Sequence, residues 1–202
     1  MPPAAQILFA AKIRAARMPP LQTGGNPMPK KVLSVLVDNH AGVLARVASL
    51  FGRRGFNIDS LSVAATDNPA LSRITIVTSG DNAENGVCEL DQIMRQTEKL
   101  LETRAVFLVE PSAGVLRELL LVKVGADELT RAHLREIALI YKAKTIDLSP
   151  GSMIFELTGE PEKIDAYLEM LRDYPILELC RTGITALGRG APGYRLKEGL
   201  LG

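Results

Sequence analysis

The sequence has no tryptophan and few other aromatic residues, with four tyrosines and five phenylalanines among 202 residues. Proteins that bind single-stranded nucleic acids stack the bases on exposed aromatic side chains, so this scarcity argues against such a surface. The formal net charge is +1 at pH 7, and so balanced a charge offers no general attraction to nucleic acid or to an anionic membrane. We therefore predict no nucleic acid and no membrane among the partners of this protein.

Cysteine and histidine are scarce as well, with two residues of each type. Cys88 and Cys180 lie far apart in the sequence, and free thiols in a reducing cytoplasm are the default interpretation. The histidines, His40 and His133, do not combine with the cysteines at any zinc-site spacing. Since no apolar run reaches the roughly 18 residues of a membrane span, we expect a cytoplasmic protein without a bound metal.

The sequence contains no Gly-x-Ser-x-Gly elbow, no P-loop and no Gly-x-Gly-x-x-Gly turn. We therefore predict no catalytic residue and no cofactor. Two alternatives stay open. His40 could act as a base, or it could be a solvent-facing loop residue. The carboxylates of Asp38 and Asp59 could form a pair, or Asp38 could cap its loop while Asp59 occupies a strand face.

Residues 1–29 differ from the rest of the chain, because they include Lys12, Arg14 and Arg17 but no acidic residue. An acid-free, arginine-bearing leader could be an organellar transit peptide, although such leaders are usually rich in serine and this one has none. The alternatives are a disordered extension and a start assigned too far upstream of Met28. We predict a disordered N-terminal extension, and a transit peptide would instead make the protein organellar.

From Lys30 onward the spacing of apolar residues is regular and predicts strands and helices in alternation. The first set of elements is expected at 32–37 (strand), 43–54 (helix), 58–65 (strand), 71–78 (strand), 87–101 (helix) and 106–109 (strand). The second set is expected at 119–124 (strand), 128–141 (helix), 143–148 (strand), 153–158 (strand), 160–171 (helix) and 176–180 (strand). Each set has the order strand-helix-strand-strand-helix-strand, which is the ferredoxin-like plan.

The predicted fold class is therefore α+β, with two tandem ferredoxin-like (βαββαβ) domains. We place the first domain at 30–110 and the second at 115–190, with a short linker between them and a tail at 191–202. The strands at 32–37 and 106–109 are apolar on both faces, whereas a sheet with helices on one side should be polar on the other. Because this small domain has no third layer to cover that face, we expect a homodimer formed through the first domain.

The loop Asp38–Gly42 joins the first strand to the first helix. Its glycine can let backbone N–H groups face outward at the positive end of the helix, which would suit a carboxylate. Asn39 can both donate and accept hydrogen bonds, as the paired charges of a free amino acid require. Asn and Gly also occur in any tight loop or helix cap, so the loop alone leaves a purely structural role open.

Several blocks of residues make the chain similar to a known family. They are Leu33–Val47, Phe51–Leu61, Val63–Asp67, Leu71–Ile76, Arg117–Val124, Arg181–Ile184 and Leu187–Gly190. The chain resembles the small regulatory subunits of acetohydroxyacid synthase (acetolactate synthase), which have an N-terminal ACT domain. The blocks Arg54–Ile58 and Leu71–Arg73 are far more specific than the loop alone, and the resemblance extends from residue 31 to about residue 190.

The resemblance implies a regulatory protein without an active site of its own. Such a subunit binds the thiamine-diphosphate-dependent catalytic (large) subunit, raises its activity and confers feedback inhibition by valine or another branched-chain amino acid. The effector would bind between two ACT domains. Carried over by position, the effector-binding residues are Asn39, His40, Ala41, Gly42, Val43 and Leu44, with Asn57 and Ile58 from the facing protomer.

The chain departs from the family pattern in a few places. His40-Ala41 stands where the family often has a Glu/Asp-Ser or similar pair, which leaves the identity of the effector open. The turn at 81–86 looks longer than usual, and the leader is additional. Two rival functions remain: a free-standing ACT-type amino-acid sensor that regulates another enzyme or transcription, and, more distantly, an enzyme that uses His40. The second domain and residues 181–190 favour the regulatory subunit, since a bare sensor needs neither.

Overall fold

The computed structural model describes residues 30–79 and 89–190. The predicted extension at 1–29, the tail at 191–202, the turn at 81–86 and Cys88 lie outside the described residues. Cys180 is a free, exposed thiol. In the part of the chain that the structure describes, no helix is both long and apolar enough to cross a membrane.

The described residues divide into two compact units. The first contains residues 30–79, 89–116 and 183–190, and the second contains residues 117–182. Both have the predicted ferredoxin-like topology, so the expected α+β fold class is confirmed. The boundary differs from the expected one, because residues 183–190, which we assigned to the second domain, pack within the first unit.

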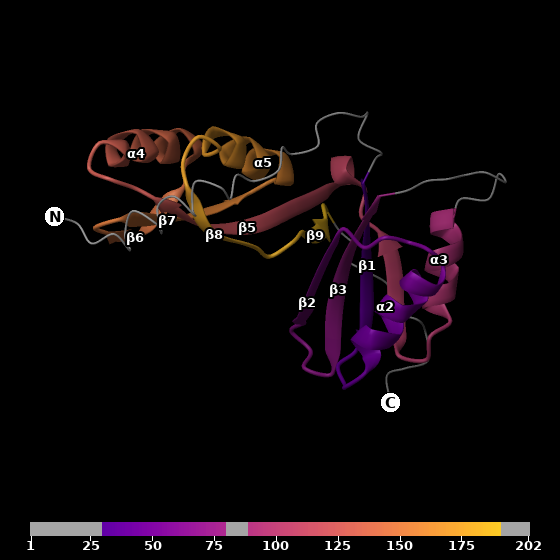
Figure 1. Ribbon diagram of the computed structural model, residues 1–202. Coiled ribbons are helices and arrows are strands. Elements are labelled where there is room, and N and C mark those ends of the chain that lie inside the picture. The colour runs from indigo at the N-terminus through magenta and orange to yellow at the C-terminus, as the bar shows by residue number, and fades with distance from the viewer. Residues whose placement is uncertain (1–29, 80–88, 191–202) are drawn as a thin grey trace. The chain divides into compact units, whose positions relative to one another are not determined.

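The first unit contains a four-stranded antiparallel sheet with the strand order β2-β3-β1-β4. Its elements are β1 (Lys30–Asp38), α2 (Val43–Arg53), β2 (Ser60–Ala65), β3 (Leu71–Ser79), α3 (Glu89–Glu98) and β4 (Thr103–Leu108). Both helices lie on the same face of the sheet (Figure 1). Apolar residues at helical spacing on α2 turn toward Leu33 and Val35 of β1 and build the main core.

The opposite face of this sheet is covered by the chain itself. The N-terminal part of the first unit ends with the 3₁₀ turn η1 (Pro111–Ala113) and the start of β5 (Gly114–Gly125). A short strand from much later in the sequence, β9 (Thr185–Gly188), pairs with β5. Ile184 and Ala186 are buried there against Val32, Val77 and Val109. The inference that only a second copy could cover this face was therefore wrong. Sequence periodicity did not predict β9, because a four-residue strand is too short to show a pattern.

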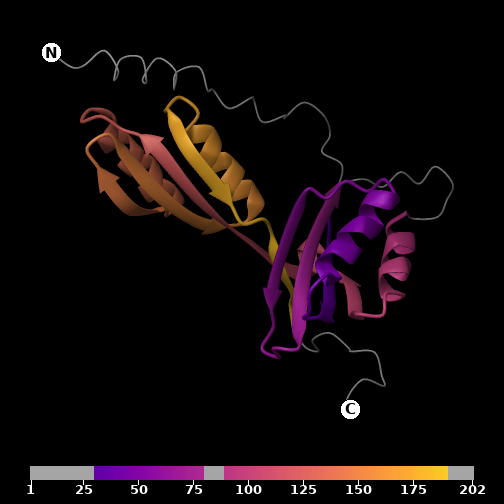
Figure 2. The ribbon, with the colours of Figure 1, turned by 60° about the horizontal axis from the view of Figure 1, so that its bottom comes forward.

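The second unit repeats the plan with the strand order β6-β7-β5-β8. From Arg117 onward, β5 is followed by α4 (Thr130–Tyr141), β6 (Lys144–Ser149), β7 (Ser152–Gly159), α5 (Pro161–Met170) and β8 (Ile176–Arg181). Figures 1 and 2 show α4 and α5 side by side over one face of this sheet. A core of aliphatic residues, Phe155 and Tyr167 fills the space between the helices and the sheet.

A partly buried ion-pair network joins the first and last strands of the second unit. Arg181 on β8 donates to both carboxylate oxygens of Glu118 on β5, at 2.8 and 2.7 Å, and also to Asp165 on α5 at 2.7 Å. The Glu118 side chain is only 4% exposed. Loss of Glu118 removes two charge-assisted hydrogen bonds from Arg181, which would keep only its pair with Asp165.

We expect Glu118→Ala to lower the free energy of unfolding of the second unit by about 1.5–3 kcal/mol, the contribution of hydrogen bonds to charged groups. The control is Glu160→Ala, because the Glu160 pair with Arg117 is solvent-exposed and should contribute less than about 1 kcal/mol. Three of the four tyrosines, Tyr141, Tyr167 and Tyr174, lie in the second unit. Tyrosine fluorescence during urea unfolding therefore reports on this unit, and equal small losses for both variants would contradict the prediction.

Candidate functional site

The loop between β1 and α2 leaves the first turn of α2 without a side-chain cap. Gly42 begins the helix in the left-handed conformation, at φ 88°, and the first turn contains no acidic residue. The first N–H groups of a helix have no partner within it and form its positive end. No side chain caps the N–H donors at the start of α2, and whether an anion binds there stays a prediction.

Asn39 ties this loop to the turn between β2 and β3. Its backbone N–H donates to the carbonyl oxygen of Ala70 at 2.8 Å, and its side-chain Nδ2 donates to that of Pro69 at 2.9 Å. The amide therefore has the structural role that the sequence left open, with a partner in the turn after β2. Its Oδ1 accepts no hydrogen bond from the described residues, so this oxygen can still accept one from a ligand's ammonium group.

The other loop residues differ in what they can offer to a ligand. His40 is exposed, with Nδ1 3.1 Å from the carbonyl oxygen of Ala41. A general base is usually oriented by a third group, and no other side chain is hydrogen-bonded to His40 in the described part of the chain. The Val43 side chain is buried in the core and can offer only its backbone, whereas Leu44 is 42% exposed.

The Asp38 carboxylate does not cap the loop, which was one of the two alternatives that the sequence left open. It binds Arg104 of β4 through two hydrogen bonds, each of 2.6 Å. The Asp38 N–H donates to the carbonyl oxygen of Glu102 at 2.9 Å, and the Glu102 carboxylate pairs with Arg46 of α2. Sequence reasoning missed these partners because they are far from Asp38 along the chain, and only the pairing of β1 with β4 brings them together.

Asn57 and Ile58 do not lie beside the loop in a single chain. Asp38 is opposite Leu71 on β3, whereas Ser60, just after Ile58, is opposite Val77. Six residues of strand separate these positions, or about 20 Å. Asn57 is exposed and donates to Asp59 at 2.7 Å, while Ile58 is half-buried on the core. The Asp59 carboxylate therefore lies near Asn57, at the far end from Asp38, and the two carboxylates form no pair.

Strand β2, which follows Ile58, lies at one edge of the first sheet. Within the described residues its outer side has no neighbouring strand, and Leu61 and Val63 are 36% and 43% exposed. An exposed edge strand with apolar side chains is a surface on which another strand can pair.

Comparison with protein families gives two matches. Residues 33–105 match the acetohydroxyacid synthase (AHAS) small subunit-like ACT domain, and residues 117–190 match the family described as small subunit of acetolactate synthase. The chain is 44% identical over 168 residues to an acetolactate synthase small subunit from Mycolicibacterium smegmatis, which covers 83% of this chain and 96% of that protein. It is 41% identical over 162 residues to the isozyme 3 small subunit from Salmonella typhimurium, with coverage of 80% and 96%.

A solved structure gives the same result. The crystal structure of the acetolactate synthase small subunit from Thermotoga maritima matches with a TM-score of 0.73 at 36% identity, and covers 81% of this chain and 99% of that chain. The family resemblance seen in the sequence is thereby confirmed for both domains. The chain belongs to the family of acetolactate synthase small subunits, with an N-terminal ACT domain.

Proposed function

We propose that this chain activates the thiamine-diphosphate-dependent large subunit of acetohydroxyacid synthase and confers feedback inhibition by valine or another branched-chain amino acid. The family supports the partner, since a small subunit implies a large one. The observation that carries the effector site is the uncapped start of α2 beside Gly42. The chain would have no active site of its own, and catalysis would belong to the large subunit.

The described groups match the parts of a branched-chain amino acid. Its carboxylate would accept hydrogen bonds from the backbone N–H groups at the start of α2, where the helix dipole also favours negative charge. Its ammonium group would donate to Oδ1 of Asn39. The exposed Leu44 side chain would contact the branched apolar side chain. His40 and Ala41 would complete the loop on its solvent side.

A homodimer would complete this site. If the β2 edges of two chains pair in antiparallel fashion, the start of one β2 lies beside the end of the other. Asn57 and Ile58 of a second copy, which precede β2, would then come close to the loop after β1. In this dimer the loop of one chain and Asn57 of the other could contact the same ligand, although about 20 Å separates these positions within one chain. The dimer is thus proposed from the exposed edge of β2 and not from an uncovered sheet face, because Ile184 and Ala186 cover that face.

The chain alone should not convert pyruvate to acetolactate, because we assign the reaction to the large subunit. Mixing it with the purified large subunit should raise the rate until the binding sites are saturated. The measurement is acetolactate formation against the concentration of the chain. Acetolactate formed by the chain alone, free of large subunit, would overturn the assignment of catalysis.

Gly42→Asp should weaken valine inhibition about a hundredfold or more and leave activation nearly unchanged. The added carboxylate stands where the effector carboxylate should bind, and each charge-assisted hydrogen bond lost costs about 1.5–3 kcal/mol, while about 1.4 kcal/mol is tenfold in affinity. The measurement is a pair of titrations of the rate, one with this chain and one with valine.

Two alanine variants control for folding in this experiment. A Cβ at Gly42 meets nothing within 4 Å, but φ +88° disfavours any L-residue, whereas Gly151 has the same open space without a positive φ. Gly42→Ala should therefore show the cost of the backbone alone, and Gly151→Ala should show none. Loss of activation and inhibition together in Gly42→Asp would mean that the loop is structural, and loss of neither would place the effector elsewhere.

Replacing Leu61 and Val63 of β2 by lysine should separate the dimer. Like charges facing each other across paired edge strands are destabilising, so light scattering should show a monomer, and valine inhibition should be lost because each site lacks its second half. Leu101→Lys is the control, since Leu101 is exposed in the same unit but far from β2 in sequence. A stable dimer that keeps valine inhibition would contradict the proposed interface.

A further inference from the structure

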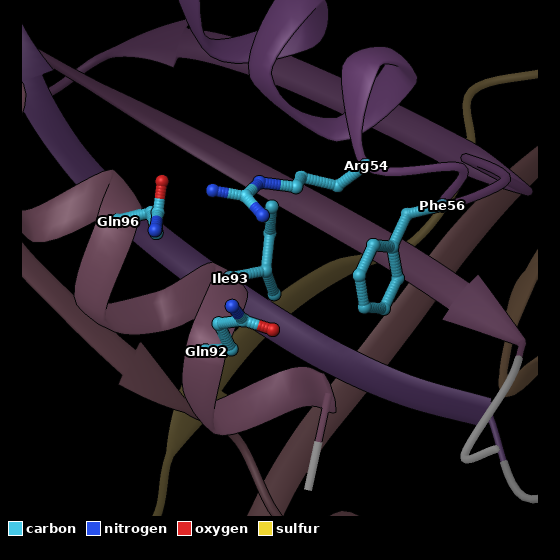
Figure 3. A pocket seen from close by; sticks show the side chains of 5 residues that line it. All are labelled: Arg54, Phe56, Gln92, Ile93 and Gln96. Carbon is cyan, nitrogen blue, oxygen red and sulfur yellow. The ribbon is translucent and has the colours of Figure 1, made fainter. Parts of the chain in front are cut away.

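A small pocket lies in the first unit between the end of α2 and α3, at the end of α2 away from the loop. Its volume is about 120 Å³, and it is lined by Arg54, Phe56, Gln92, Ile93 and Gln96. Figure 3 shows the Arg54 side chain extending from the end of α2 toward α3, from which Gln92, Ile93 and Gln96 project. None of the lining residues was assigned a role in the effector site.

The polar side-chain groups of this pocket have no hydrogen-bond or ion-pair partners among the described residues. The guanidinium of Arg54 forms no ion pair there, and neither carboxamide, of Gln92 or Gln96, has a side-chain hydrogen bond within those residues. The backbone N–H of Arg54 donates to the carbonyl oxygen of Phe51 and closes the last turn of α2. None of the five lining residues is acidic. Three side chains with N–H donors thus meet in one hollow whose lining includes no carboxylate.

The rest of the pocket wall is apolar. Ile93 is 1% exposed, and the half-buried ring of Phe56 packs edge-on against Phe51, with ring centroids 6.2 Å apart. Both side chains belong to or pack against the core of the unit, so their positions are fixed. The pocket therefore pairs a cationic, amide-lined part with a rigid apolar part.

We propose that this pocket binds a short-chain monocarboxylate. A guanidinium matches a carboxylate through two parallel hydrogen bonds, the carboxamides can add further N–H donors, and the apolar tail would lie against Phe56 and Ile93. A cavity of roughly 150 Å³ accommodates benzene, so 120 Å³ suits a ligand of about five non-hydrogen atoms. Phosphate fits less well, because it has no apolar part to place on the Phe56 and Ile93 wall.

The full chain offers a direct test by nuclear magnetic resonance. Sodium propionate is titrated into ¹⁵N- and methyl-labelled protein at constant ionic strength, with 1-propanol and inorganic phosphate in parallel. We expect saturable shifts at Ile93 and Phe56 with propionate, with none from 1-propanol and weaker binding of phosphate. Shifts confined to Gly42 and Leu44 would place the carboxylate at the start of α2 and overturn the proposal, as would tighter binding of phosphate than of propionate.

Two neighbouring arginines provide the matched variants. Arg54→Gln removes the charge from the pocket and should weaken propionate binding about tenfold or more, as expected for the loss of a charge-assisted hydrogen bond. Arg53→Gln removes the same charge from the last residue of α2, which does not line the pocket, and should leave the affinity unchanged. Equal effects of both variants would mean a diffuse attraction to the end of α2 and would overturn the site.

A third variant keeps the proposal falsifiable if Arg54→Gln does not fold. Gln96→Met retains the length of the side chain and removes its amide, and we expect it to weaken propionate binding severalfold. The binding of propionate does not depend on the large subunit or on valine, so this experiment fails or succeeds independently of the proposed regulatory function. Unchanged affinity in both Arg54→Gln and Gln96→Met would exclude this pocket.

Discussion

Burial of β1 on both faces is the constraint on which the first unit depends. Every residue from Val32 to Val37 is nearly inaccessible to solvent, so the chain must provide two covering layers for one strand. Helices α2 and α3 provide the first layer, and Ile184 and Ala186 contribute to the second. The second cover comes from residues that follow the whole second unit in the sequence. The first ferredoxin-like unit is consequently not complete at residue 110, and its stability depends on residues more than 70 positions further along.

This dependence also explains which parts of the fold could be predicted from sequence. Helices such as α2 and strands such as β3 show their apolar periodicity locally, so their positions follow from the sequence alone. The two apolar faces of β1 were also visible, and they correctly indicated that a cover exists. The identity of the cover was not predictable, because β9 is four residues long and pairs with a strand about 70 residues away. A local pattern carries no information about such a contact.

In the candidate site, too, local features could be predicted from the sequence and long-range contacts could not. Gly42 in the left-handed conformation at the start of a helix was predictable, because the requirement for glycine is local. The ion pair between Asp38 and Arg104 was not, since it depends on the register between β1 and β4. The donation from Asn39 to Pro69 depends likewise on where the turn after β2 lies. The separation of Asn57 from the loop follows from strand length, and only the resemblance to the family linked the two.

The hydrogen bonds that hold the loop between β1 and α2 affect how it could bind a ligand. The loop is exposed to solvent and cannot be held by burial, yet an anion site built from backbone N–H groups requires fixed positions. Asp38 is held by Arg104 on one side, and Asn39 by Pro69 and Ala70 on the other. Val43 anchors the end of the loop in the core. Because these contacts order the backbone before any ligand arrives, little conformational entropy remains to be lost on binding, and the interaction energy can appear as affinity. Asn39 would have both roles, since its N–H groups hold the loop while its Oδ1 would accept a hydrogen bond from the ligand.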